Sequence, residues 1–234
     1  MLKSVYNLGA DFSWNYDAVF KKLNEPYDIP NISNRSTYYS MLKKSKLKSK
    51  VATTNYTSLA ETKTERSTIY LHGKLTWFED LTRLTVFDCT DSKEQQLLNK
   101  SNRILPFILI PSGVKPLICP KQIREFSKFI EELDDTDTLV VVGYKFNSED
   151  NHINSIIADW LRNANKTLIY LNYNDDLSFD NLSWASDFSV ETFEGFDSVS
   201  IKQINKQKII NISTDSHSCN NVFSAILSYL EDNT

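Results

Sequence analysis

Three short polar clusters in the sequence hold side chains that can bind a ligand or move a proton. They are TTNYT at 53–57, HGK at 72–74 and GYKFNSEDNHIN at 143–154. His72 can act as a general base, because a histidine titrates near neutral pH. Asn55 can orient a hydroxyl group or a water molecule through its amide. The candidate ligand-binding residues of these clusters are Thr53, Thr54, Gly143, Tyr144, Asn147, Asp150 and His152.

Each cluster also has a purely structural interpretation, which the sequence leaves open. His72 can be a hydrogen-bonded histidine at the end of a buried strand. Asn55 can form an Asx-turn that caps a helix at 57–62. The 143–154 loop can be the acidic, capped start of a helix, with Asn147 or Ser148 as the cap. Tyr144 and Phe146 can pack in the core instead of stacking on a ligand.

A metal centre is not expected from the sequence. Asp150 and His152 are possible ligands, but a metal site needs three or four converging ligands and the carboxylates are scattered along the chain. The three cysteines, Cys89, Cys119 and Cys219, are far apart and form no C-x-x-C pair. They therefore predict neither a zinc module nor a disulfide framework, and free thiols fit a reducing cytoplasm.

The polar clusters follow apolar segments that read as strands at 50–56, 67–74 and 138–144. A helix with Ile153, Ile157 and Leu161 on one face follows the third of these strands, and another strand follows at 166–174. This strand–helix–strand unit predicts parallel strands covered on both faces. Ligands bind beyond the carboxyl ends of such strands, so we expect the three clusters to meet at one edge of one sheet.

The remaining segments complete an α/β pattern. A glycine is expected to stop the strand at 67–74, and RILPFILIPSGVKPLICP at 103–120 reads as two short extended pieces because it holds four prolines. The other expected elements are helices at 16–23, 36–45, 123–133 and 221–230, a strand at 83–88, and short or edge strands at 199–204 and 207–213.

Composition indicates one globular domain of 234 residues, since 41% of the residues are hydrophobic and can fill a core. The net charge of −4 does not favour nucleic-acid binding, and no segment predicts a membrane span or a signal sequence, so we expect a cytoplasmic protein. The basic run KKSKLKSK at 43–50 is either a solvated helix end or a patch that contacts an anionic partner.

The segments VATTNYTSLAE at 51–61, IYLHGKL at 69–75 and LVVVGYKFNSEDNHINSII at 139–157 resemble, in this order, the sirtuin-like (silent-information-regulator-like) NAD-binding domains of bacterial antiphage defence proteins. The resemblance implies a Rossmann-like α/β fold, with a mostly parallel sheet and helices on both faces. It implies that NAD is the substrate, that Asn55 and His72 serve its cleavage, and that the loop from Gly143 to His152 holds the nucleotide.

The chain departs from that family at its start. The glycine-rich turn that cradles pyrophosphate has only LGADFS at 8–13 as a counterpart, with Asp11 where a glycine belongs. We therefore expect an incomplete sirtuin-like domain without the first strand. Its expected parts are a helical segment at 1–48, a Rossmann-like core at 49–175, and C-terminal strands with a closing helix at 176–234.

The resemblance implies an NAD+ glycohydrolase that cleaves the nicotinamide–ribose bond in abortive infection, as a homo-oligomer or in a larger complex. The alternative is a catalytically defective module that binds NAD or ADP-ribose, or only assembles with other proteins. An unrelated nucleotide-binding hydrolase is a third possibility. A sirtuin-type deacylase is not expected, because such enzymes usually carry a four-cysteine zinc module that these cysteines cannot build.

Overall fold

The architecture is taken from a computed structural model of the chain. It describes residues 38–83, 85–91, 94, 98, 103–108, 120–173, 179, 182–194, 208–214 and 219–233. The expected helix at 16–23, the expected strand at 199–204, the second extended piece of 103–120 and the LGADFS segment lie outside these residues. None of the helices in the described ranges combines the length and the apolar character needed to cross a membrane.

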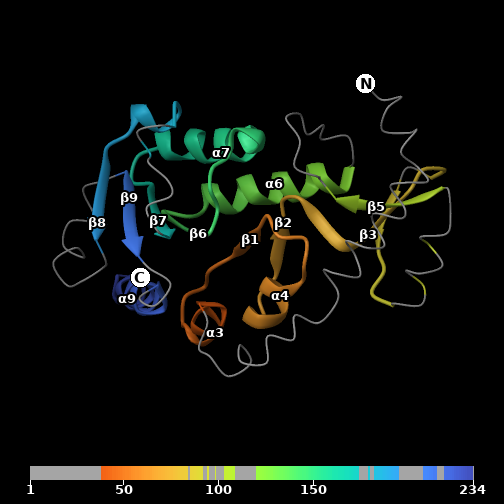
Figure 1. Cartoon of the computed structure of the whole chain (residues 1–234), viewed down its shortest axis with the longest axis horizontal. Coiled ribbons are helices and arrows are strands. Elements are labelled where there is room, and N and C mark those ends of the chain that lie inside the picture. Colours follow the sequence, from red (N-terminus) through yellow and green to blue (C-terminus); the bar gives the residue numbers. More distant parts are fainter. Residues whose placement is uncertain are drawn as a thin grey trace.

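A four-stranded parallel sheet lies in the left part of the view in Figure 1. Its strands are β6 (Thr138–Val142), β7 (Thr167–Tyr173), β8 (Val190–Glu194) and β9 (Ile209–Thr214), in the order β6-β7-β9-β8. The sheet confirms the predicted strands near 138–144 and 166–174. The segment at 207–213 was predicted as a short or edge strand, but β9 lies between β7 and β8.

Alternate side chains of β7 enter two different cores, one on each face of the sheet. Leu168 and Tyr170 pack against α6 (Pro120–Asp134) and α7 (Asn151–Arg162). Ile169 and Leu171 pack against α9 (Cys219–Asp232), and α3 (Tyr38–Lys44) joins that side. Each fully buried aliphatic side chain contributes about 1.5–3 kcal/mol. The predicted sheet with helices on both faces is therefore confirmed (Figure 1).

Helix α7 follows the predicted apolar spacing, with Ile153, Ile157, Trp160 and Leu161 buried. The indole Nε1–H of Trp160 donates to the carbonyl of Leu133 at 2.6 Å, which ties α7 to the end of α6. The predicted capping is wrong in detail. A single 3-10 turn, η1 (Ser148–Asp150), comes before α7, and among the described residues neither Asn147 nor Ser148 caps the helix through its side chain.

A second parallel pair of strands carries the other two polar clusters. Strand β1 (Val51–Thr53) pairs with β2 (Thr68–Tyr70), and α4 (Leu59–Thr64) connects them. Within the described residues this pair and β6 belong to two separate sheets, so the expectation of one continuous sheet is wrong. The pair nevertheless packs into the same core as α6 and α7, because Ile69 and Leu71 join Val141 there.

The strand predicted at 67–74 is in fact divided by a turn at Leu71 and His72. Gly73, with φ of +89°, begins β3 (Gly73–Asp80) instead of ending β2. Strand β3 lies between β4 (Thr85–Asp88) and β5 (Ile104–Ile108) in an antiparallel sheet. The predicted strand at 83–88 is thus confirmed, and the proline in β5 fits a position at the sheet's edge.

Candidate functional site

The centre of the candidate site is a buried pair, His72 and Asp150. His72 lies in the turn between β2 and β3 and is 6% exposed, while Asp150 lies in η1 and is 7% exposed. His72 Nε2 is 3.1 Å from Asp150 Oδ1. A carboxylate at this nitrogen favours the tautomer that carries the proton on Nε2 and the lone pair on Nδ1. The pair therefore has the composition and geometry of an oriented general base.

Backbone hydrogen bonds bring the first polar cluster to this pair. The N–H of Leu71 donates to the carbonyl of Thr53, and the N–H of Leu75 donates to the carbonyl of Tyr56, both at 2.9 Å. The rings of Tyr56 and His72 consequently lie 6.3 Å apart. Burial raises the pKa of the Tyr56 phenol, and the negative charge of Asp150 raises it further. Tyr56 therefore stays protonated beside the pair at neutral pH.

Asn55 lies on the exposed side of this junction. Its backbone N–H donates to the hydroxyl oxygen of Thr53 at 3.1 Å, while Thr53 and Thr54 are half-buried. Helix α4 begins at Leu59 with Ser58 in the capping position, so the alternative in which Asn55 caps a helix at 57–62 is wrong. Asn55 is thus an exposed residue between Thr53 and Tyr56, whose carbonyls are hydrogen-bonded to the segment on either side of His72.

The turn that carries His72 is held from the outside by two polar residues of α6. Gln122 donates from Nε2 to the carbonyl of Leu71 at 2.6 Å, and Glu125 Oε2 accepts the N–H of Tyr70 at 3.2 Å. Both side chains are almost completely buried. They satisfy the N–H of Tyr70 at the end of β2 and the carbonyl of Leu71 in the turn, and so fix the position of His72. They could not be identified from the sequence, because a glutamine and a glutamate on a helix are usually exposed, whereas both lie on the buried face of α6 with Phe126 and Phe129.

The Gly143–Asp150 loop approaches the pair from the carboxyl end of β6. Gly143 adopts φ of +70° and Phe146 adopts φ of +51°, both in the left-handed region. A Cβ atom added at Gly143 would meet nothing within 4 Å, so the backbone conformation, and not crowding, explains the glycine. Gly143 and Asn147 are exposed, which leaves both accessible to a ligand.

One buried amide, Asn154, determines the shape of this loop. It donates from Nδ2 to the carbonyls of Phe146 and Asn147 at 3.1 and 3.0 Å, and its Oδ1 accepts the hydroxyl of Tyr144 at 2.9 Å. Asn154 is 2% exposed. This role could not be predicted from the sequence. The only available signal was a polar residue next to Ile153, on the apolar face of the predicted helix.

The two aromatic side chains of the loop face the protein interior. Phe146 is 1% exposed and packs against the rings of Tyr170, Phe179 and Trp184, so core packing is the correct alternative for it. Tyr144 is half-buried, with its ring 4.9 Å from that of Phe146. Burial raises the pKa of its phenol, and the charge of Asp150 adds to that effect. Tyr144 thus positions the loop through Asn154.

His152 completes a cluster with the buried pair. Its ring lies 6.1 Å from the ring of His72 and 5.2 Å from that of Phe126. One ligand atom from each of His72, Asp150 and His152 can be chosen so that all three lie within 4.8 Å of one another. The sequence argument against a metal assumed scattered ligands, whereas the fold gathers two imidazoles and a carboxylate at one point.

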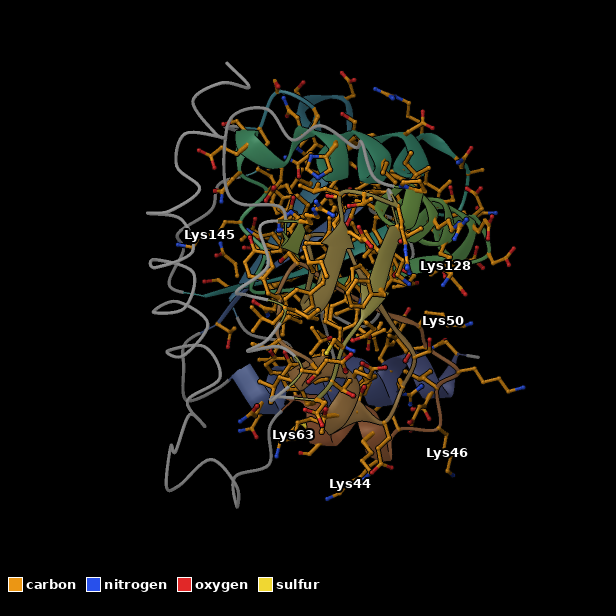
Figure 2. All side chains as sticks on the ribbon, turned by 90° about the vertical axis from the view of Figure 1, so that its right-hand side faces the viewer. Lys44, Lys46, Lys50, Lys63, Lys128 and Lys145 are labelled. Carbon is orange, nitrogen blue, oxygen red and sulfur yellow. The ribbon has the colours of Figure 1, made fainter. Side chains whose placement is uncertain are left out.

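The basic run at 43–50 lies away from this cluster and is held by Arg66. The guanidinium donates to the carbonyls of Leu42 and Leu47 at 2.8 Å each, and to further oxygens of Ser45 and Ser49. The run's lysines are exposed, and Figure 2 shows Lys44, Lys46 and Lys50 extending outward. Exposed lysines fit both expectations for the run, a solvated helix end and a patch that contacts an anionic partner.

Neither a family model nor a curated protein matches the sequence. Solved structures of Sir2 homologues are similar in fold. An NAD complex of one matches at 12% identity, covering 98% of this chain and 75% of the other, with a TM-score of 0.50. A mutant in complex with 2′-O-acetyl ADP-ribose matches at 12% identity over 99% and 76%, with a TM-score of 0.51. An ADP-ribose complex of another mutant matches at 13% identity over 99% and 76%, with a TM-score of 0.50. The chain therefore has a sirtuin-like α/β fold.

Proposed function

We propose that this chain is a sirtuin-like NAD+ glycohydrolase that cleaves the nicotinamide–ribose bond. The observation that carries the proposal is the buried His72–Asp150 pair, which lies beside the exposed Asn55 at the carboxyl ends of β1 and β2. The sirtuin-like fold and the motif resemblance support NAD+ as the substrate. The resemblance also supports a role in antiphage defence, in which depletion of NAD+ would end the infection together with the host cell.

The reaction suits these residues. The bond between C1′ of the ribose and N1 of nicotinamide breaks, and its electrons neutralise the cationic ring, so no acid is required to protonate the leaving group. Water adds to the oxocarbenium-like C1′, and His72 accepts the proton that this water loses. The Asp150 carboxylate stabilises the imidazolium that forms. The products are nicotinamide and ADP-ribose, or a cyclic form when a group of the substrate replaces the water.

The remaining site residues are assigned to binding. Asn55 orients the ribose or the attacking water, and Thr53 and Thr54 line the same junction. The exposed backbone around Gly143 and the side chain of Asn147 contact the nucleotide, while His152 lies at the nicotinamide end. These assignments rest on the motif resemblance and on chain position, since Thr53, Thr54 and Asn55 follow β1 at the junction with the His72 turn, and Gly143 and Asn147 belong to the loop that ends at Asp150.

The test is incubation of the full chain with NAD+ and chromatography of the products, with Asn55→Ala and His72→Ala measured alongside. Removal of a general base is expected to lower the rate by about 10²–10⁴-fold. Asn163→Ala is the matched control for Asn55, because Asn163 is exposed at the opposite end of α7. Light scattering on the same sample reports the oligomeric state. Absence of NAD+ turnover at every oligomeric state rejects the glycohydrolase. Turnover in both site variants that equals that of the unaltered chain rejects it as well.

A second candidate is a module that binds NAD or ADP-ribose, or assembles with other proteins, without turnover. The low exposure of both His72 and Asp150 favours it, because a substrate has limited access to the pair. Calorimetry with NAD+ and with ADP-ribose separates the two candidates. Tight binding without cleavage identifies a module that binds the nucleotide. Absence of binding favours a module that only assembles with other proteins.

A further inference from the structure

We propose that His72, Asp150 and His152 form a site for a divalent transition-metal cation, Zn²⁺, and that the ion blocks the proposed NAD chemistry. The three ligand atoms lie within 4.8 Å of one another. His72 comes from the β2–β3 turn, whereas Asp150 and His152 come from η1 and the first turn of α7. The fold therefore brings together two separate segments. The first supplies one imidazole, and the second supplies a carboxylate and the other imidazole.

The ligand set selects the kind of ion. Two imidazoles and one carboxylate suit Zn²⁺ and its neighbours in the first transition row, whereas Mg²⁺ and Ca²⁺ prefer oxygen ligands alone. Zinc–nitrogen and zinc–oxygen bonds of about 2.0–2.2 Å place the ligand atoms of a tetrahedral site about 3.3–3.5 Å apart. The 3.1 Å between His72 Nε2 and Asp150 Oδ1 is already close to that spacing. The Nε2 atom of His152 is buried as well, although the residue as a whole is only half-buried, and the three ligand atoms need to close from within 4.8 Å to that spacing.

Local charge also favours a cation. Asp150 is 7% exposed, and its Oδ1 lies 3.1 Å from His72 Nε2 in the interior. A buried carboxylate is stabilised by a positive partner, and a bound divalent ion supplies one at the shortest distance. Three protein ligands leave a fourth position for water, as in zinc sites that exchange their ligands with solvent.

The inhibitory part of the inference rests on the proposed function. A metal bound through His72 disrupts its pairing with Asp150 and removes the imidazole from proton transfer. Zinc occupancy and NAD+ cleavage are therefore mutually exclusive, and added Zn²⁺ lowers turnover while a chelator restores it. The ion acts as an inhibitor in this scheme, and the cleavage reaction itself proceeds without a metal.

Metal binding is measured directly on the chelator-treated full chain by calorimetry with ZnCl₂ and by the absorption spectrum of added Co²⁺. We expect one equivalent of Zn²⁺ and a Co²⁺ spectrum of nitrogen and oxygen ligands without thiolate bands. Asp150→Asn and His152→Ala are expected to weaken binding at least about tenfold. Asp159→Asn, an exposed aspartate on the same helix, and His217→Ala, the third histidine of the sequence, are expected to leave it unchanged.

A second variant guards against misfolding as an explanation. His152→Phe keeps a ring beside Phe126 but cannot ligate a metal, and its thermal unfolding is compared with that of the unaltered chain. Unchanged Zn²⁺ affinity in folded His152→Phe overturns the site. Zinc binding in a chain that never cleaves NAD+ upholds the site and rejects the glycohydrolase, since binding is measured without turnover. Zinc binding that leaves NAD+ cleavage unaffected overturns the inhibitory part.

Discussion

His72 Nε2 and Asp150 Oδ1 lie 3.1 Å apart in the interior, although His72 belongs to the turn after β2 and Asp150 to the turn before α7. Neither side chain is exposed by more than a tenth of its surface. An imidazole and a carboxylate buried together stabilise each other, and removal of one leaves the other without its partner in a poorly hydrated place. The pair thus links the stability of the fold to the proposed chemistry.

Asp150→Asn is expected to lower kcat for NAD+ cleavage at least about tenfold with little change in KM, because the amide removes the charge that stabilises the imidazolium. Steady-state kinetics on the folded variant measures the two constants separately. Asp159→Asn is the matched control, since Asp159 lies on α7 with 83% of its side chain exposed. A rise in KM with unchanged kcat would instead assign Asp150 to substrate binding alone.

Asn154→Ala is expected to lower the free energy of unfolding by about 2–3 kcal/mol, because it removes hydrogen bonds to two loop carbonyls and to the Tyr144 hydroxyl. The loop then loses its fixed shape, so KM for NAD+ should rise. Urea unfolding and kinetics measure the two effects. Tyr144→Phe removes only one of these hydrogen bonds and should lower the free energy of unfolding by about 1 kcal/mol. Equal costs for the two variants would contradict the central role of Asn154.

Strands β6, β7 and β9 of the parallel sheet could be predicted because they are largely apolar on both faces. Leu168 and Ile169 are both fully buried although they point to opposite sides, and this produces the continuous apolar run that indicates a covered parallel strand. Strand β8 was missed because Val190 and Phe193 are only partly buried and two of its five residues are glutamates. The β9 segment was predicted only as a short or edge strand, because its position between β7 and β8 depends on contacts that no local pattern records.

The site could be predicted only as a set of residue types. His72 and Asn55 were identified from their polar clusters, and the structure brings both to one junction. The partner of His72 could not be identified, because the pairing with Asp150 depends on the packing of β2 against α6 and α7. Gln122 and Glu125 could not be identified for a similar reason. Their side chains hydrogen-bond the backbone of Leu71 and Tyr70, which is about 50 residues away in the sequence.

Arg66→Ala is expected to destabilise the chain by about 2–3 kcal/mol, since the guanidinium bonds carbonyl groups of the 42–49 segment that would otherwise lack a charged donor. The segment should also become sensitive to trypsin at its exposed lysines. Urea unfolding and limited proteolysis test both effects. Arg83→Ala, whose side chain is 80% exposed, is the control and should cost less than about 0.5 kcal/mol. An equal decrease in the free energy of unfolding in the two variants would contradict a special role for Arg66.

Alkaline conditions are expected to destabilise the fold through Tyr70 and Tyr144. Burial raises the pKa of both phenols, and for Tyr70 the hydrogen bond that it donates to Glu61 at 3.0 Å raises the pKa further. The folded state therefore holds these protons more tightly than the unfolded chain does. The stability that this provides is fully present below the unfolded pKa of about 10, and it is lost as the pH rises above 10 toward the folded values.

Urea unfolding at several pH values above 9 measures this loss as a falling free energy of unfolding. Tyr70→Phe and Tyr144→Phe should each make the decline shallower, because a phenylalanine has no proton to lose, while lysine titration affects all variants alike. Tyr39→Phe on α3 controls for the removal of a phenol elsewhere. A decline as steep in both site variants as in the unaltered chain would show that these two buried phenols do not carry the alkaline instability.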